Sequence, residues 1–445
     1  MGILKTFSLG GIHPPENKIS KSEVIESLPI SKVVYIPLGQ NLGAPAKAVV
    51  KRGDEVKVGQ LIGKGEAFIS ANVHSSVSGK VKKIDNIVDT SGYKHPAIVI
   101  DVDGDEWLED IDRSTDVKRD FNLDTAQIIE VIKEKGIVGL GGATFPSHVK
   151  LMVPDGKKAD YLIINGVECE PYLTADHRIM LERGEEILIG ISILMKGLGV
   201  EKALIGIENN KPDAIDNLSK LAKEFKGIEV HPLKVQYPQG GEKQLIKALV
   251  NREVPSGKLP IEVGCVVNNV GTALAIYEAV QKNKPLIERV VTVTGKSLKR
   301  TANLLVRIGT PAKELVEFVG GAPDDTGKVV NGGPMMGKAL VSLDAPIVKG
   351  SSGILLFKEE ETKRVEVTNC IRCGKCISVC PMGLEPVLMA QFSENKMFEN
   401  LEKELVMDCI ECGSCQYTCP AGRPLLDYIR IGKSKVGNII RNRRK

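Results

Sequence analysis

The sequence predicts a multidomain α/β protein whose C-terminal part is a small, helical, cysteine-rich module. Three observations carry this prediction. Residues 30–105 are rich in Val, Ile and Gly, helices alternate with short apolar strands from about Leu123, and a twelve-residue cysteine motif occurs twice near the end of the chain. With 445 residues, the chain is long enough for three or four domains.

Composition excludes several classes of partner and location. Aromatic residues make up 4% of the chain, which argues against a stacking platform for nucleic acid, and a net charge of +4 is too small to indicate a polyanion partner. The longest apolar run, Ile187–Met195, has about half of the ~18 residues that a membrane span needs, so it predicts a buried helix. Because the first residues lack the long apolar core of a signal peptide, we expect an intracellular protein with no transmembrane segment of its own.

Residues 1–120 form the first predicted domain. Short strands surround turns at Gly53–Asp54 and Ser78–Gly79, and this pattern resembles the barrel-sandwich hybrid of biotinyl and lipoyl domains. In that family a lysine at a hairpin tip carries the cofactor, whereas the matching position here falls near Phe68, with no lysine there. We therefore expect this domain to be unlipoylated and to serve in packing or docking.

Residues 121–287 form the second predicted domain, in which helices and strands alternate. This alternation predicts a parallel α/β layer whose ligands lie beyond the carboxyl ends of its strands. The loops expected at that edge are Gly139–Lys150, Asn165–Arg178, Tyr237–Leu245 and Val266–Ile276. The first loop follows a helix and has Thr144 in place of a third glycine, so it fails the Rossmann dinucleotide fingerprint. Bare amides and a lysine suit a phosphate, and paired asparagines suit a polar ring.

The remaining predicted domains are a small β-grasp at residues 288–345 and an α-helical ferredoxin at residues 360–445. The first has the order strand, turn, strand, helix. In the second, apolar residues between the two cysteine motifs recur at helical spacing. This spacing favours an α-helical ferredoxin over the small β-rich kind.

Each cysteine motif has the spacing C-x2-C-x2-C-x3-C-P, starting at Cys370 and at Cys409. In two-cluster ferredoxins three closely spaced thiolates bind one iron–sulfur cube, and the fourth binds the other cube. The predicted ligands of two [4Fe–4S] clusters are therefore Cys370, Cys373, Cys376 and Cys419 for one, and Cys409, Cys412, Cys415 and Cys380 for the other. Zinc and disulfides are the alternatives, but neither segment contains the histidine of mixed zinc sites, and disulfides are rare in a reducing compartment.

The loops of the second domain resemble, in order, those of the flavin- and NADH-binding subunit of respiratory complex I. The matching residues are Gly141-Gly142-Ala143-Thr144-Phe145-Pro146 with Lys150, then Asn165, Glu168, Glu170 and Pro171, then Tyr237 with Gly241-Glu242, and Asn268-Asn269 with Thr272. The opening Gly10–Lys18, the barrel-sandwich and the paired cysteine motifs resemble, more narrowly, the RnfC family of the Rnf electron-transport complex. Two departures are Lys243, where complex I has a second acid, and a second cluster motif.

This resemblance implies a Rossmann-like FMN/NADH-binding domain and an SLBB-type β-grasp. The residues implied in cofactor binding are Gly139, Gly141, Gly142, Phe145, Lys150, Asn165, Glu168, Tyr237, Gly241, Asn268, Asn269 and Thr272. It also implies that NADH stacks on FMN near Phe145, with Glu170 and Glu242 as the catalytic acids beside it.

The resulting functional prediction is an NADH-oxidising, or reversibly NAD-reducing, peripheral component of a membrane-bound ferredoxin:NAD oxidoreductase that moves Na+ or H+. Expected partners are the other Rnf proteins, including the membrane-embedded ones and the iron–sulfur protein RnfB, with ferredoxin as an indirect partner. The expected location is the cytoplasmic face of the bacterial membrane. The alternatives are a soluble cobalamin-reductase-type flavin/iron–sulfur protein and a non-enzymatic iron–sulfur relay, which leaves the flavin loops unexplained.

Overall fold

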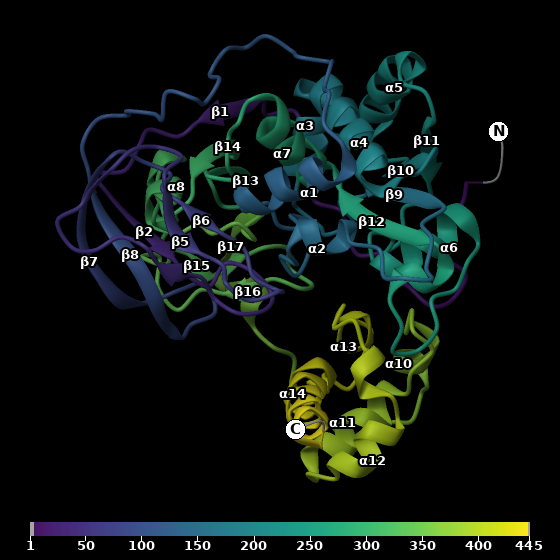
Figure 1. Cartoon of the computed structure of the whole chain (residues 1–445). Coiled ribbons are helices and arrows are strands. Elements are labelled where there is room, and N and C mark those ends of the chain that lie inside the picture. Colours follow the sequence, from purple (N-terminus) through teal and green to yellow (C-terminus); the bar gives the residue numbers. More distant parts are fainter. Residues whose placement is uncertain (1–3, 444–445) are drawn as a thin grey trace.

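A computed structural model describes residues 4–443 and shows four regions that follow one another along most of the chain (Figure 1). The barrel-sandwich, the β-grasp sheet and the α/β layer lie together, and the helical cysteine-rich region lies below them at the C-terminal end (Figure 1). No helix within residues 4–443 is both long and apolar enough to cross a membrane.

The N-terminal region is a sandwich of two small antiparallel sheets. One has the order β2 (Val33–Pro37), β8 (Lys94–Val102), β7 (Gly79–Val88) and β4 (Glu55–Val56), and the other β3 (Lys47–Ala48), β5 (Leu61–Lys64) and β6 (Val73–His74). Alternate residues such as Val34, Ile36, Ile98 and Ile100 are fully buried between the sheets, as expected where one face of each strand forms the core. Phe68, between β5 and β6, is 66% exposed.

The sandwich packs beside the glycine loop of the α/β layer. The Leu42 amide donates to the Thr144 carbonyl at 3.2 Å. The Lys349 ammonium donates to the carbonyls of Asn72 and Gly136, each at 2.7 Å. These contacts join the sandwich to the α/β layer.

The α/β layer has four parallel strands in the order β11 (Ile228–Leu233), β10 (Ala203–Glu208), β9 (Tyr161–Asn165) and β12 (Cys265–Asn269). Its helices are α1 (Thr125–Glu134), α2 (Ser147–Leu151), α3 (Ala175–Glu182), α4 (Gly184–Leu198), α5 (Pro212–Leu221), α6 (Glu242–Val250) and α7 (Val270–Gln281). The apolar run Ile187–Met195 lies in α4 and is largely buried, as predicted. The chain runs outward from β9 to β11 and returns to β12 on the other side of β9. The strand order therefore reverses between β9 and β12, the position where such sheets bind ligands.

The β-grasp region is built on a six-stranded sheet. Its order is β1 (Ile25–Ser27), β14 (Ala302–Arg307), β13 (Glu288–Thr294), β17 (Gly353–Lys358), β15 (Thr326–Asn331) and β16 (Lys338–Ala339), with helix α8 (Ala312–Phe318). Two of the strands, β1 and β17, come from outside residues 288–345, and β1 pairs in parallel with β14. The N-terminal segment thus crosses from one region to another before the barrel-sandwich begins.

From Glu359 onward the described residues of the C-terminal region form helices joined by loops, and no strand. Its helices are α9 (Glu359–Thr362), α10 (Lys375–Ser378), α11 (Pro386–Glu394), α12 (Phe398–Lys403), α13 (Ser414–Tyr417) and α14 (Leu425–Arg443). Met389 of α11 and Ile429 of α14 are buried in one apolar core. In each motif a short helix contains the third cysteine, so the sequence repeat is also a structural repeat.

Candidate functional site

Asn165 and Asn269 end the two strands at the switch point and lie opposite each other in the sheet register. The Asn269 side chain caps α7, because its Oδ1 accepts from the Gly271 amide at 2.8 Å. Its Nδ2 donates to Asp176 Oδ2 at 2.6 Å. Asn165 donates from Nδ2 to the Gly240 carbonyl at 2.9 Å and so joins β9 to the Tyr237 loop.

Asn268 differs from both of these neighbours. Asn268 is 4% exposed, and neither Oδ1 nor Nδ2 of its side chain has a hydrogen-bond partner among residues 4–443. Buried side-chain amides are almost always hydrogen-bonded, since an unpaired one costs about 1–3 kcal/mol. A polar ligand that both donates and accepts hydrogen bonds would satisfy this amide, and a flavin with its ribityl chain is such a ligand.

The glycine loop lies against the same strand ends. The Leu140 amide donates to Thr272 Oγ1 at 3.0 Å, and the Gly139 amide donates to the Phe145 carbonyl at 2.9 Å. A Cβ at Gly141 would lie 2.8 Å from Asn269 Nδ2, so glycine allows this close approach. A Cβ at Gly142 would meet nothing within 4 Å, and the backbone there is exposed. Hydrogen bonds fix the start of the loop, while the exposed backbone at Gly142 is open to a ligand, and this arrangement suits a phosphate group.

Lys150 and Glu242 complete this cluster. The Lys150 ammonium donates to the Val267 carbonyl at 2.8 Å and lies 3.5 Å from Glu242 Oε1. Gly241 is the N-cap of α6, which begins at Glu242. Lys243, which departs from the complex I pattern, points elsewhere: its ammonium donates to the Pro255 carbonyl at 3.3 Å and lies 4.0 Å from Asp408 of the cysteine-rich region.

The two acids of the Asn165–Arg178 loop have partners of their own. The Glu168 carboxylate accepts from the backbone amides of Asp176 and His177, at 2.7 and 3.2 Å, at the start of α3. Glu170 accepts from the amides of Met335 and Met336 in the β-grasp region, at 3.0 and 2.8 Å. Burial there raises the pKa of Glu170 to about 7.

Tyr237 joins this region to the cysteine-rich module. Its side chain is 2% exposed, and its hydroxyl donates to the Cys412 carbonyl at 2.9 Å and lies 3.4 Å from Glu170 Oε1. Gln244 of α6 makes a second bridge, from Nε2 to the Pro381 carbonyl at 3.0 Å. The Tyr237 loop and α6 therefore contact the backbone around Cys380 and Cys412 directly.

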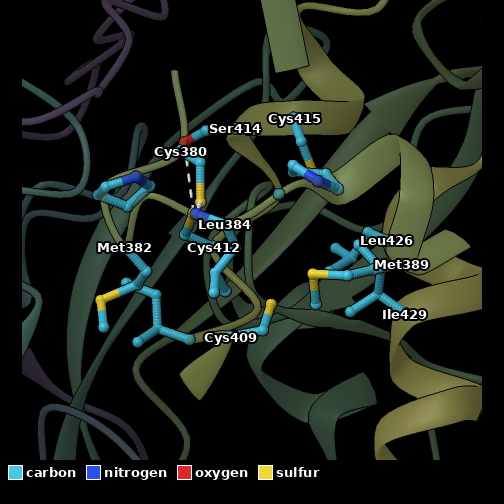
Figure 2. A pocket seen from close by; sticks show the side chains of 14 residues that line it. Cys380, Met382, Leu384, Met389, Cys409, Cys412, Ser414, Cys415, Leu426 and Ile429 are labelled. Atoms are coloured by element: carbon cyan, nitrogen blue, oxygen red, sulfur yellow. Dashed lines mark hydrogen bonds between the residues drawn. The ribbon is translucent and has the colours of Figure 1, made fainter. Parts of the chain in front are cut away.

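Four cysteines line one cavity in this module (Figure 2). They are Cys380 from the first motif and Cys409, Cys412 and Cys415 from the second. The other lining residues are mostly apolar and include Met382, Leu384, Met389, Ile410, Leu426 and Ile429. This grouping is the one expected if the fourth cysteine of the first motif binds the cluster held by the first three cysteines of the second motif.

The chemistry of the cavity fits a cluster. The Leu384 amide donates to Cys380 Sγ at 3.4 Å, a hydrogen bond typical of cluster thiolates. Burial raises the pKa of the Cys409 thiol to about 11, and bound iron would instead hold it as a thiolate. No three His, Cys, Asp or Glu side chains within residues 4–443 converge on a single metal ion. The four thiols instead line one cavity from several sides, as the four ligands of a multi-iron cluster would.

The two motifs fold alike but differ in exposure. Arg372 and Glu411 both have φ 56°, and their amides donate to Cys370 and Cys409 Sγ, each at 3.4 Å. Cys370 and Cys373 are exposed, whereas Cys412 and Cys415 are buried. Cys376 and Cys419 are partly exposed, and they are close enough for a Cys419 thiolate to contribute to the raised pKa of Cys376, whose main cause is burial.

Several residues at the site carried no prediction from the sequence. Asp176 binds Asn269, and Lys18 and Lys211 bind the backbone of residues 167–173. Lys18 belongs to the opening Gly10–Lys18, which contributed only to the family resemblance. Single lysines and aspartates of this kind have no spacing pattern that separates them from surface residues.

Comparisons with known proteins follow the same division of the chain. Family models match residues 5–105 as an RnfC barrel-sandwich hybrid domain, 132–278 as a Nuo51 FMN-binding domain, 290–339 as an SLBB domain and 362–420 as a 4Fe-4S dicluster domain. These matches confirm the predicted fold class.

Curated relatives match nearly the whole chain. The C component of the proton-translocating ferredoxin:NAD(+) oxidoreductase complex of Clostridium ljungdahlii is 49% identical, over 97% of this chain and 94% of the relative. The C component of the Na(+)-translocating complex of Acetobacterium woodii is 45% identical over 98% of each chain, and that of the ion-translocating oxidoreductase complex of Rhodobacter capsulatus is 42% identical over 86% and 74%. Among solved structures, an NAD+-reducing [NiFe]-hydrogenase in the H2-reduced state matches with a TM-score of 0.50 and 17% identity, over 70% of this chain and 63% of that chain, a likeness of fold alone.

Proposed function

This chain belongs to the RnfC family of ion-translocating ferredoxin:NAD(+) oxidoreductase complexes, and we propose that it exchanges electrons between NAD(H) and two [4Fe–4S] clusters through FMN. FMN supplies the conversion between the paired electrons of a hydride and single electrons, and each cluster takes one electron at a time. The chain's own residues bind and orient these groups.

The contact that best supports this function is the junction between the flavin-side loops and the buried cysteine cavity. Asn268, Lys150 and the glycine loop offer the unpaired amide, the cation and the bare backbone that FMN binding needs. Tyr237 and Gln244, next to these loops in the fold, hold the backbone around Cys412 and Cys380. The cavity that contains Cys380 therefore lies on the flavin side of the module.

The cysteines of the first motif are the more exposed, so the cluster that they bind would exchange electrons with a neighbouring protein. Cys370 and Cys373 are exposed, so the cluster predicted on Cys370, Cys373, Cys376 and Cys419 lies nearer the surface. We propose that single electrons pass between the buried and the exposed site, and then between the exposed site and a neighbouring protein of the complex. That neighbour would be a membrane-embedded Rnf protein or the iron–sulfur protein RnfB, with ferredoxin further along and this chain on the cytoplasmic face of the membrane.

Purification under anaerobic conditions tests this function. We expect about one FMN and about eight iron atoms per chain, together with NADH-dependent reduction of ferricyanide. A chain that binds both clusters but no flavin would be a relay, and the proposed function would then be wrong. A soluble reductase of the cobalamin type would not associate with the membrane-embedded Rnf proteins, which co-purification from detergent-solubilised membranes measures.

A further inference from the structure

The N-terminal segment contacts three parts of the candidate site in turn. The Gly11 amide donates to the Val379 carbonyl at 2.9 Å, beside Cys380 of the cysteine cavity. Ile12 and Tyr237 then exchange a pair of backbone hydrogen bonds of 2.8 and 2.9 Å. Further along, Lys18 reaches the loop that follows β9. This segment therefore lies where the cysteine module, the Tyr237 loop and the Asn165–Arg178 loop meet.

The Lys18 ammonium sits in a ring of backbone carbonyls. Its Nζ donates to the oxygens of Glu168, Glu170 and Leu173, at 2.7, 2.9 and 2.7 Å. An ammonium has three N–H donors, so these three bonds use all of them. Lys18 lies 150 to 155 positions from its acceptors in the sequence. It therefore joins two distant parts of the chain.

A second buried lysine extends the same arrangement. Lys211 is 2% exposed, and its Nζ donates to the Val167 carbonyl at 2.7 Å. Its charge is balanced by Glu208, 3.7 Å away and equally buried. Two ammonium groups thus hold four carbonyls of residues 167–173.

The loop needs such support because two of its residues adopt the left-handed region. Glu168 has φ 47° and Tyr172 has φ 70°, and neither is a glycine. In a trans peptide the N–H points opposite to the C=O. With the Glu168 carbonyl fixed on Lys18, the Cys169 amide is turned to the other side of the loop, and it donates to no acceptor within the described chain.

We propose that Lys18 is a positioning residue of the NAD(H) and flavin site, which fixes the backbone of residues 167–173 and thereby the placement of Glu168, Glu170 and Asn165. This inference rests on the proposed function. All three N–H donors of Lys18 are used by carbonyls of the loop, so Lys18 acts on the site through the loop backbone.

The test compares Lys18→Met with Lys21→Met in otherwise complete protein. Met keeps most of the length of lysine and removes its charge and donors, and Lys21 is an exposed lysine three residues further along. In Lys18→Met with full FMN and iron, we expect kcat/KM for NADH to fall at least tenfold, which corresponds to the loss of one charge-assisted hydrogen bond. We also expect a shifted flavin midpoint potential. Lys21→Met should match wild type in both measurements.

Hydrogen exchange supplies a readout that does not need NADH oxidation. The amides of Val167 and Tyr172 are hydrogen-bonded, to Asn165 Oδ1 at 3.0 Å and to the Glu16 carbonyl at 2.9 Å. Both should exchange faster in Lys18→Met and not in Lys21→Met. Failure of the proposed function would show in wild-type protein, whereas failure of this inference shows only in the comparison of variants. Unchanged exchange, kinetics and potential in loaded Lys18→Met would overturn it.

A measurement on wild-type protein covers the case in which Lys18→Met does not fold. Burial, followed by the charge of Lys211, lowers the pKa of Lys18 to about 8, against the opposing charges of Glu168, Glu208 and Cys169. Loss of the ammonium proton should weaken the carbonyl ring, so kcat/KM for NADH should fall as pH rises through about 8. A flat profile between about pH 7 and 9, with both clusters intact, contradicts the inference.

Discussion

Replacing Cys380 with alanine should remove the buried cluster and leave the exposed one. Cys380 lies in the first motif, yet it lines the same cavity as Cys409, Cys412 and Cys415. Each [4Fe–4S] cluster holds four iron atoms, so iron should fall from about eight to about four per chain. Cys265→Ala is the matched control, because Cys265 is fully buried in β12 and outside both motifs, and this variant should keep all of its iron.

The rate at which a chelator removes iron shows which cluster remains in each variant, because the cysteines of the two clusters differ in exposure. In Cys380→Ala the remaining ligands include Cys370 and Cys373, both exposed, so a chelator should remove the remaining iron quickly. In the mirror variant Cys419→Ala the surviving site includes the buried Cys412 and Cys415, so iron release should be slower. Iron analysis followed by chelator kinetics measures both quantities. Slow release from Cys380→Ala together with fast release from Cys419→Ala would refute the crossed assignment.

Three further substitutions test the flavin side. Lys150→Ala should lower FMN retention about tenfold or more and spare the iron, because a charge-assisted hydrogen bond contributes about 1.5–3 kcal/mol; unchanged retention would remove Lys150 from the site. Asn268→Leu should abolish FMN retention yet stabilise the flavin-free protein, since the Asn268 side-chain amide is buried without a partner among the described residues. Thermal unfolding with and without FMN measures the loss of stabilisation by FMN and the gain in stability of the flavin-free protein. Glu170→Gln should keep FMN and iron but slow NADH oxidation, which wild-type ferricyanide kinetics would contradict. Because burial raises the pKa of Glu170 from 4.5 to about 7, the unfolded chain binds fewer protons between those values, so wild-type stability should fall as pH rises through that range and the Gln variant should lack this fall.

The predictions that succeeded rested on local patterns. Each C-x2-C-x2-C-x3-C-P motif places three thiols within seven residues of the chain, so they can bind one cluster. Both copies adopt the same loop, with Arg372 and Glu411 at equal φ. The alternation of strands and helices predicted the parallel layer, and the matching family models confirm its class. The buried helix at Ile187–Met195 followed from apolar composition alone.

Sequence patterns could not show which role each residue of the candidate site has. Asn268 and Asn269 are adjacent and chemically identical, yet Asn269 caps α7 while Asn268 has no partner within the described part of the chain. Glu168 and Glu170 are two residues apart, yet one caps α3 and the other binds the β-grasp loop at Met335 and Met336. The direction of each side chain depends on backbone dihedrals that spacing does not reveal.

The sequence by itself determined the kinds of domain and the cofactor classes, and it predicts the eight motif cysteines as cluster ligands, because each of these depends on residues close together in the chain. Tertiary structure decided which groups meet across long separations. Lys18 reaches Glu168 across 150 positions, and Tyr237 reaches Cys412 across 175. Such contacts exist only once separate apolar cores have packed together, so the burial that gives these polar groups their partners is a property of the whole fold.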